Sequence, residues 1–166
     1  DLPAGLVTDD PVKAYRLGRD LAALTHGHPS GWIAAGAFAA IICELVNGTE
    51  RTQAVQTGLL LVESEEAGEE VAEALSAAIA ASEQPELSVT QIEELGAGWI
   101  AEEALAISVA CFLTDLTPRE QMLLAVNHSG DSDSTGSIVG NLIGVSKGLS
   151  AIPKHWCQDL EMIGVI

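Results

Sequence analysis

The sequence predicts an all-α protein, and three observations support this fold class. Alanine and other strong helix formers are abundant, whereas aromatic residues make up only 4% of the chain. No alternation of apolar and polar side chains, the pattern of a β-strand, continues beyond a few residues. Apolar residues instead recur every three or four positions, the period of an α-helix. Residues 1–166 contain no repeat and no linker, so we expect one unit that is part of a larger domain.

The first expected helix covers residues 10–25. Asp10 is a typical N-cap residue, and Pro11 suits the first helical position. Gly18 lies within this segment and weakens its helical propensity. Four apolar side chains at helical spacing form a stripe that we expect to face the core: Ala14, Leu17, Leu21 and Leu24.

A central buried helix is expected over residues 32–47, because this segment is apolar nearly all round and ends at Asn47-Gly48. Further helices are expected over residues 52–64, 65–82, 100–112, 120–126 and 136–149, with a loop over residues 83–89. The acidic side chains of the 65–82 segment are interpreted as a solvated face. Its inward stripe should consist of Val71, Leu75, Ala78 and Ile79.

The composition excludes some classes of function. A net charge of −17 with only seven Lys and Arg residues repels phosphate backbones, so we expect no nucleic-acid partner. Helix N-termini and bound cations can still hold a polyphosphate ligand on such a surface. The longest apolar stretch, residues 32–46, is shorter than the roughly 18–20 residues of a membrane span, so no membrane is expected either. Three cysteines in apolar contexts, Cys43, Cys111 and Cys157, predict reduced thiols in a cytoplasmic protein.

The segment from His128 to Thr135 is the strongest candidate for a site. Asp131, Asp133 and Ser134 crowd together directly before an expected helix. Carboxylates two residues apart in a loop can converge on one cation, and oxygen ligands select hard ions such as Mg²⁺ rather than zinc. These three side chains are therefore candidate metal ligands.

Three other interpretations share these letters. Residues 131–135 also spell the DxDxT motif of haloacid-dehalogenase phosphatases, but that chemistry needs an apolar strand before the first Asp, and the polar NHSG precedes it here. An EF-hand loop needs Glu at its twelfth place, where Leu142 stands. A capping loop, with Ser134 or Thr135 as the N-cap and the acids complementing the helix dipole, remains open at this point.

Glycines recur at every fourth position of the following helix, at Gly136, Gly140, Gly144 and Gly148, which aligns them along one side. Glycine costs roughly 1 kcal/mol relative to alanine in a helix interior. We therefore expect the four glycines to allow a neighbouring helix to approach closely and so to hold the acidic residues rigidly.

Four segments carry a resemblance to a known family. SGDSDSTGSIVGNLIGV is similar to the C-terminal signature of the ADP-ribosylglycohydrolases, GGDxD[ST] before a glycine-containing helix, with Ser129 in place of the first glycine, and AIPKHW resembles the family's ending. LTHGHPSG resembles the family's Thr-His-x-x-Pro turn, which implies that His26 contacts ADP-ribose. GAGWIAEEALAISVACFL resembles the segment beside the adenosine pocket, which implies that Gly98 and Trp99 lie close to the base. For an isolated His or Trp, helix capping or core packing is the alternative.

The resemblance implies a compact orthogonal helical domain, of which residues 1–166 are the C-terminal portion. The expected activity is Mg²⁺-dependent cleavage of the N-glycosidic bond between ADP-ribose and a protein side chain, and the DSDST letters resemble the arginine-directed branch. Asp131, Asp133 and Ser134 would hold one or both of two Mg²⁺ ions, and the two aspartates would also be the catalytic residues. The expected partner is an ADP-ribosylated protein or ADP-ribose itself. A non-catalytic ADP-ribose-binding or crystallin-like relative is the alternative.

The resemblance also implies that the remaining metal ligands come from an N-terminal half outside this chain, in a Thr-Asp-Asp motif. Thr8-Asp9-Asp10 has these letters, but it stands shortly before the histidine turn, where the family has an ordinary helix start. We interpret Asp10 as an N-cap. Residues 1–166 alone are therefore expected to be inactive.

Overall fold

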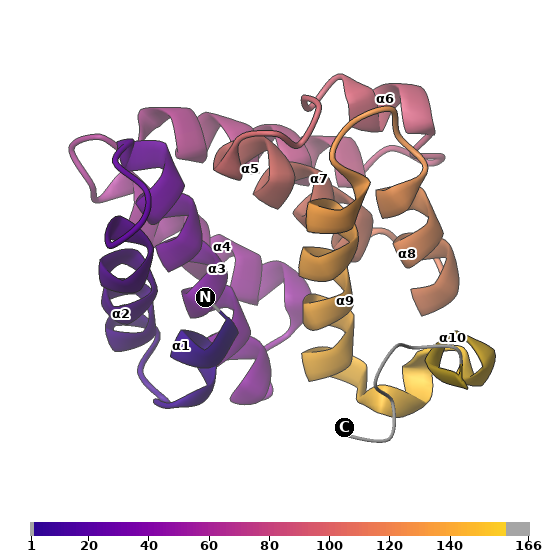
Figure 1. Ribbon diagram of the computed structural model, residues 1–166, viewed down its shortest axis with the longest axis horizontal. Helices are drawn as coiled ribbons and strands as arrows, with labels where there is room; N and C mark the ends of the chain where they lie inside the picture. The colour runs from indigo at the N-terminus through magenta and orange to yellow at the C-terminus, as the bar shows by residue number, and fades with distance from the viewer. Residues whose placement is uncertain (1, 159–166) are drawn as a thin grey trace.

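A computed structural model describes residues 2–158, and this part of the chain is entirely helical (Figure 1). It contains ten α-helices, one 3-10 helix and no strand, which confirms the all-α prediction. The helices are α1 (Leu2–Leu6), α2 (Pro11–Ala23), α3 (Pro29–Val46), α4 (Arg51–Glu63), α5 (Glu69–Ser82), α6 (Val89–Glu93), α7 (Ala101–Leu113), α8 (Pro118–Val126), α9 (Ser132–Lys147) and α10 (Lys154–Gln158), with η1 at Leu149–Ala151. In Figure 1, α1 and α2 lie on one side of the molecule and α8 to α10 on the other.

Helix α2 begins as predicted but buries a different face. The Asp10 carboxylate accepts the backbone N–H groups of Val12 at 3.0 Å and Lys13 at 3.3 Å, as an N-cap does. The buried residues are Ala14, Tyr15, Gly18 and Ala22. Of the predicted core positions, only Ala14 is buried, whereas Leu17, Leu21 and Leu24 are 38%, 45% and 80% exposed. The predicted stripe was therefore wrong for all three leucines.

Close contact between α2 and α3 explains this difference. A Cβ atom at Gly18 would lie 2.7 Å from the Cβ of Ala39 and 2.9 Å from the carbonyl oxygen of Ala35. A Cβ atom at Gly36 would lie 2.9 Å from the carbonyl oxygen of Tyr15. Only small residues fit between two backbones at this separation, so glycine and alanine occupy the contact and the leucines are displaced to its edge.

Helix α3 is the central buried helix, as predicted. It contacts α1, α2, α4, α7 and α9, and its C-terminus lies at Asn47, followed by Gly48 with φ of 85°. With 18 residues and a mean hydropathy of 1.6, it is long and apolar enough to cross a membrane. However, 72% of this helix is buried inside the fold. Its apolar character is therefore accounted for by its place in the core of the described residues.

Helices α5, α7 and α9 complete the core. Val71, Leu75 and Ala78 of α5 are fully buried and Ile79 packs against them, as the sequence predicted. Ser108 joins α7 to α9, because its buried hydroxyl lies 2.7 Å from the carbonyl oxygen of Ala104 and 3.2 Å from that of Thr135. Cys43 and Cys111 are buried free thiols, as expected, and burial raises the pKa of Cys111 to about 12. Cys157 is partly exposed.

The predicted boundaries differ from the structure at several helices: α3 begins three residues earlier than predicted, at Pro29, and α5 begins four residues later, at Glu69. Helix α6 begins at Val89, the last residue of the predicted loop, and no helix was predicted there. Ser88 and Gln91 form a capping box at its start. Helix α8 starts two residues earlier than predicted, at Pro118, behind a second capping box. Helix α9 starts four residues earlier than predicted, at Ser132. The last difference matters most for function, because it places Asp131 at the N-cap and Asp133 inside the first helical turn.

The glycines of α9 fulfil the predicted packing role at one position only. A Cβ atom at Gly136 would lie 2.7 Å from Cγ1 of Val126 on α8, so this glycine does permit a close approach. At Gly140 the nearest atom would be Cε of Met122 at 3.8 Å, and at Gly144 no atom lies within 4 Å. Gly148 adopts φ of 75° and ends the helix. The predicted four-glycine contact was therefore wrong beyond Gly136.

Candidate active site

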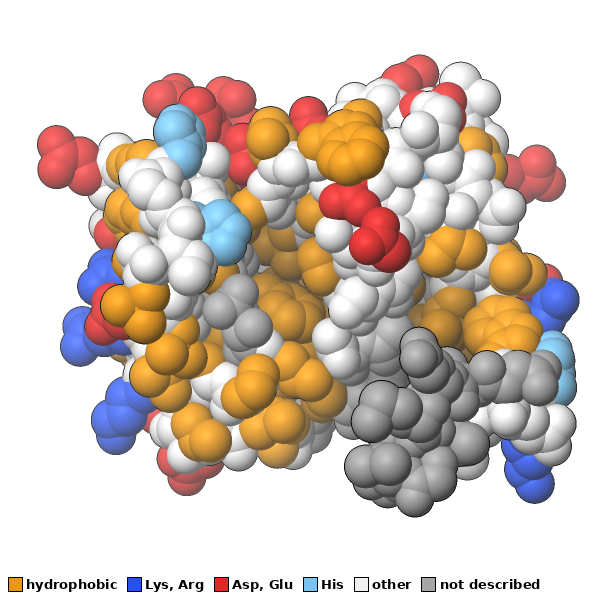
Figure 2. Space-filling view, viewed as in Figure 1, with side chains coloured by type: hydrophobic (Ala, Val, Ile, Leu, Met, Phe, Trp, Pro, Cys, Tyr) orange, Lys and Arg blue, Asp and Glu red, His pale blue; other side chains and the backbone are white. Residues whose placement is uncertain are grey.

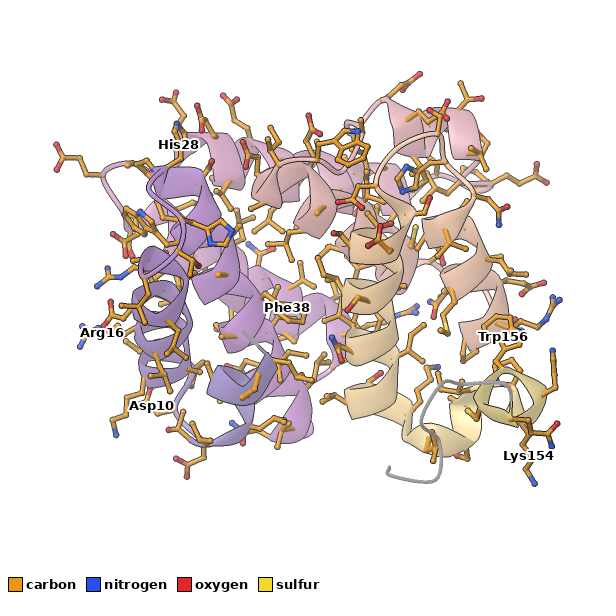
Figure 3. All side chains as sticks on the ribbon, in the orientation of Figure 1. Asp10, Arg16, His28, Phe38, Lys154 and Trp156 are labelled. Carbon is orange, nitrogen blue, oxygen red and sulfur yellow. The ribbon has the colours of Figure 1, made fainter. Side chains whose placement is uncertain are left out.

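A cleft of about 960 Å³ opens between the two sides of the molecule. The turn between α2 and α3 and the first half of α3 form one wall, and the 98–100 loop, α7 and α9 form the other. Phe38, which is labelled in Figure 3, contributes to the lining from α3. Figure 2 shows a hollow in this face, with histidine side chains on one side of it and acidic side chains on the other. Ligand-binding clefts for small molecules typically fall in this size range.

The acidic residues occupy the start of α9, and they do not all face the cleft. Asp131 stands at the N-cap position, and Asp133 and Ser134 lie in the first turn. Asp131 and Ser134 line the cleft, whereas Asp133 is exposed and is not part of its lining. The structure therefore separates Asp133 from the two residues with which the sequence grouped it. The alternative that was left open, a capping loop with Ser134 or Thr135 as the N-cap, is wrong in its residues, because Asp131 occupies the N-cap position.

Asp131 is held in its ionised form. The side chain of Ser134 is the largest influence that lowers its pKa, while partial desolvation acts in the opposite direction. The Ser134 backbone N–H also lowers this pKa. The Asp131 side chain nevertheless completes no capping hydrogen bond of standard geometry. Asp131 therefore presents a negatively charged carboxylate to the cleft.

The Gly96–Trp99 loop lies directly against the acidic turn. Oε2 of Glu103 accepts the N–H groups of Ala97 and Gly98, both at 3.0 Å, which fixes the loop to the first turn of α7. The backbone N–H of Asp131 donates to the carbonyl oxygen of Ala97 at 2.8 Å. Gly98 adopts φ of 76°, a conformation that favours glycine. Glu103 thus positions a loop that in turn holds Asp131.

Gly130 makes this contact possible. A Cβ atom on Gly130 would lie 1.8 Å from the carbonyl oxygen of Ala97 and 2.6 Å from its carbonyl carbon. Both atoms belong to backbone, so no side chain can rotate away to make room. The second glycine position of the family's GGDxD[ST] pattern therefore has a steric explanation here, whereas Ser129 at the first position is exposed.

A buried histidine supports the turn from behind. Nδ1 of His128 accepts the N–H of Gly130 at 3.0 Å, so in the neutral ring the proton lies on Nε2. Nε2 then donates to Oγ1 of Thr135 at 3.0 Å, and that hydroxyl donates to the carbonyl oxygen of Ala125 at 2.7 Å. His128 is only 6% exposed and Thr135 is fully buried. This chain of hydrogen bonds connects the end of α8 to the start of α9.

The remaining predicted residues meet at the same cleft. His26 is exposed on the wall opposite the acidic turn, with Nδ1 2.9 Å from Oγ1 of Thr25. Gly31 leaves room for its ring, because a Cβ atom there would lie 3.2 Å from the Cβ of His26. Trp99 lines the cleft with its side chain 73% exposed, so it is not a core residue. His26, Gly98, Trp99, Asp131 and Ser134 are thus brought together.

The Thr8-Asp9-Asp10 segment lies elsewhere. Oγ1 of Thr8 accepts the N–H of Asp10 at 3.2 Å, and Asp10 caps α2, as predicted. Figure 3 shows Asp10 and His28 toward opposite ends of α2, a helix of 13 residues. At 1.5 Å per residue, about 20 Å separates this segment from the histidine turn. None of its three residues lines the cleft.

The donor set suits a hard cation but supplies only part of a coordination shell. Asp131 provides a carboxylate and Ser134 a hydroxyl, both oxygen donors of the kind that Mg²⁺ selects. Across residues 2–158, no group of three or more His, Cys, Asp or Glu side chains is arranged to hold a metal ion. Mg²⁺ takes six ligands and usually retains several waters, so one carboxylate and one hydroxyl fit as a partial site. The polar residues before Asp131 follow helix α8 and not a strand, which removes the structural basis of the phosphatase interpretation.

Sequence reasoning missed several residues of the cleft. Ser137 and Asn141 line it from α9, at three and seven residues after Ser134, and this polar stripe within an otherwise apolar helix was a readable signal. Glu102 also lines the cleft, from the first turn of α7. The roles of Glu103 and His128 could not be read from spacing, because their partners are backbone groups of loops.

Comparison with known proteins shows the family to which this chain belongs. A family model described as ADP-ribosylglycohydrolase matches residues 2–166. Over 51 residues, or 31% of this chain, it is 39% identical to the ADP-ribosyl-[dinitrogen reductase] glycohydrolase of Rhodospirillum rubrum. Over 81 residues, or 42% of this chain, it is 25% identical to the ADP-ribosylhydrolase ARH3 of Mus musculus. These matches span 17% and 22% of the two relatives' own lengths. The match over nearly the whole chain shows that it belongs to the ADP-ribosylglycohydrolase family.

Proposed function

We propose that this chain is part of a Mg²⁺-dependent hydrolase that cleaves the N-glycosidic bond between ADP-ribose and a modified protein side chain. The observation that carries the proposal is the combination of groups around one cleft: an exposed tryptophan, a histidine turn, three helix N-termini and an ionised aspartate. Each of these groups matches one chemical part of ADP-ribose. The family relationship gives the same class of substrate.

The helix N-termini favour the diphosphate. Residues from the first turns of α3, α7 and α9 all line the cleft, and these helices have 18, 13 and 16 residues. The N-terminus of a helix carries a partial positive charge and free N–H groups, which attract anions. The first turn of α3 contains no acidic residue, in contrast to those of α7 and α9. The diphosphate is therefore best placed near α3 and His26, on the side of the cleft away from Asp131.

The acidic side of the cleft favours the sugar and the base. Hydroxyl and amino groups are hydrogen-bond donors, and Asp131 and Ser134 offer oxygen acceptors. The exposed ring of Trp99 offers a flat surface on which an adenine base can stack. A net charge of −17 does not oppose this arrangement locally, because the N-terminus of α3 offsets it where the phosphates lie.

In the proposed reaction, water adds its oxygen to the anomeric carbon, the bond to the side-chain nitrogen breaks, and the proton from water passes to that nitrogen. Bound Mg²⁺ would supply the positive charge that polarises the water and orients the ribose hydroxyls. Asp131 and Ser134 would contribute ligands to it, and Asp131 would orient the attacking water. Further ligands would come from an N-terminal half of the protein. Arginine is the proposed side chain, on the basis of the DSDST letters at residues 131–135.

Asp133 is proposed in a supporting role. It is exposed outside the cleft, two residues after Asp131 in the first turn of α9. A rotation of its side chain toward a bound cation would complete the pair of carboxylates that the sequence suggested. The buried free thiols of Cys43 and Cys111 are compatible with the reducing cytoplasm, which we propose as the compartment.

Substitution of Asp131 tests the proposal. In the protein that contains both halves, Asp131→Asn should abolish the release of ADP-ribose from ADP-ribosylated arginine, because the substitution removes the charge but keeps the shape. Asp9→Asn is the matched control, since Asp9 is exposed, lies outside the cleft and should leave the rate unchanged.

Calorimetry with ADP-ribose in the presence and absence of Mg²⁺ distinguishes the hydrolase from its alternative. The hydrolase requires turnover that depends on Mg²⁺. Binding without Mg²⁺ and without turnover would identify a non-catalytic ADP-ribose-binding relative. Full turnover by Asp131→Asn at saturating Mg²⁺ would refute the assigned role.

A further inference from the structure

Two consecutive glutamates open helix α7, and the structure gives them different surroundings. Glu103 accepts two backbone N–H groups of the Gly96–Trp99 loop. Glu102 lines the cleft instead. One of its carboxylate oxygens, Oε2, is buried and has no hydrogen-bond partner among the described residues. In the described part of the chain, only Tyr15 and Gln121 share this property, and neither lines the cleft.

A buried carboxylate oxygen without a donor is costly, because it has lost its bound water and gained nothing in return. Its position in the first turn of α7 offsets part of that cost, since the helix N-terminus favours a negative charge. The hydrogen-bonding capacity of Oε2 nevertheless remains unused. Because Glu102 lines the cleft, a turn of its side chain toward the cleft would offer this oxygen to a donor on a bound ligand.

The surroundings of Glu102 indicate which part of a ligand carries the donor. Trp99 is three residues earlier in the chain, lines the same cleft and exposes its ring. A base stacked on this ring would lie beside the first turn of α7, which begins two residues after Trp99. Phosphates are excluded from this position, because the carboxylates of Glu102 and Asp131 would repel them.

We propose that Glu102 accepts a hydrogen bond from the adenosine half of the ligand and is a specificity-determining residue of the cleft. This inference rests on the proposed function, because it assumes that the cleft takes ADP-ribose. It adds a contact on the side of the ligand that does not react. Glu102 should therefore affect the affinity for the nucleotide and not the chemistry at the distal ribose.

The test compares Glu102→Gln and Glu102→Leu with the unmodified chain, by calorimetry with ADP-ribose and with ADP. Glu102→Leu removes the acceptor and should weaken the binding of both ligands roughly 10- to 100-fold, the usual effect of losing a hydrogen bond to a charged group. Glu102→Gln retains one oxygen acceptor and should weaken binding roughly 3- to 10-fold. Glu73→Gln on α5 is the matched control, because Glu73 is exposed and outside the cleft.

A stability measurement excludes a merely structural role. Because Oε2 has no partner in the described structure, both Glu102 variants should unfold at a temperature equal to or above that of the unmodified chain. A lower unfolding temperature in both variants would show that Glu102 stabilises the fold, and would overturn the inference.

The binding data can also contradict the inference in distinguishable ways. If the unmodified chain binds ADP-ribose but both variants bind it equally well, Glu102 has no part in recognition and the proposed function stands. A loss confined to ADP-ribose and absent for ADP would assign the donor to the distal ribose. Weaker Mg²⁺ binding without nucleotide, at unchanged nucleotide affinity, would assign Oε2 to a hydrated cation. If the unmodified chain binds neither nucleotide, the proposed function and the inference fail together.

Discussion

The contact between Gly130 and Ala97 supports the sharpest prediction, because it joins the two segments that form the acidic side of the cleft. In Gly130→Ala, the added Cβ atom would meet the carbonyl oxygen of Ala97 at 1.8 Å. Ordinary van der Waals contact begins near 3.4 Å, so the Gly96–Trp99 loop has to move by about 1.6 Å. The loop carries both Trp99 and the carbonyl group that accepts the Asp131 N–H.

The magnitude follows from the two contacts that are lost. Breaking the hydrogen bond between Asp131 and Ala97 costs about 1 kcal/mol, and overpacking costs typically 1–3 kcal/mol. We therefore expect Gly130→Ala to lower the free energy of unfolding by about 2–4 kcal/mol. A displacement of about 1 Å in an active site can reduce the rate about 100-fold, and we expect a loss of this order in the complete enzyme.

Urea unfolding measures the stability, and calorimetry with ADP-ribose measures the function of the cleft. Gly144→Ala is the matched control on α9, since no atom lies within 4 Å of the place that the added Cβ would occupy. Because alanine favours a helix interior, Gly144→Ala should raise the stability by up to about 1 kcal/mol and leave binding unchanged. Equal stability and equal affinity of Gly130→Ala and the unmodified chain would show that the loop does not depend on this contact.

Three further outcomes are expected. Glu103→Ala should lower the free energy of unfolding by about 2 kcal/mol and weaken ADP-ribose binding, because two loop N–H groups lose their acceptor. Glu103→Gln should retain most of the stability in urea unfolding and most of the affinity in calorimetry, since a single oxygen accepts both groups. Thr135→Val should cost about 1–3 kcal/mol in urea unfolding, because it leaves the His128 N–H unpaired, and an unchanged midpoint would contradict the hydrogen-bond chain. The hydrogen bond from Ser129 lowers the pKa of Glu93 in the folded state, so its stabilising effect is present above the unfolded pKa near 4 and is lost as the pH falls through the lower folded value. The stability difference between the unmodified chain and Glu93→Gln should therefore shrink between pH 5 and pH 2, and a constant difference would argue against this pKa shift.

Most of the fold follows from patterns that are local in sequence. The central helix α3 and the start of α2 could be predicted, because apolar periodicity and the Asp10-Pro11 cap are properties of neighbouring residues. The buried face of α2 could not. Leu17 and Leu21 are more apolar than Gly18, but the separation between α2 and α3 decides which residues fit, and this separation is a property of the assembled fold.

The candidate site could also be predicted only in part from the sequence. The letters around Asp131 predicted an acidic site at the start of a helix, and the structure places Asp131 and Ser134 at a cleft with Trp99 and His26. Asp133 lies outside the cleft because α9 begins at Ser132. The sequence predicted this start four residues too late, so the position of Asp133 could not be predicted. The unpartnered oxygen of Glu102 depends on what is missing around it within the described residues, and no sequence pattern reports that.

The central claim is that the cleft between His26 and Asp131 binds ADP-ribose. Amide chemical shifts recorded during a titration with ADP-ribose and Mg²⁺ test it most directly, because they report the position of the ligand without requiring turnover. Saturable shifts should appear first at Gly98, Trp99 and Ser134 and at the histidine turn. A second, smaller pocket is lined by Arg51 and its neighbours, and the residues around it should stay unchanged. Shifts that never saturate, or that cluster around Arg51 and leave Gly98 and Ser134 unaffected, would contradict the assignment of the cleft.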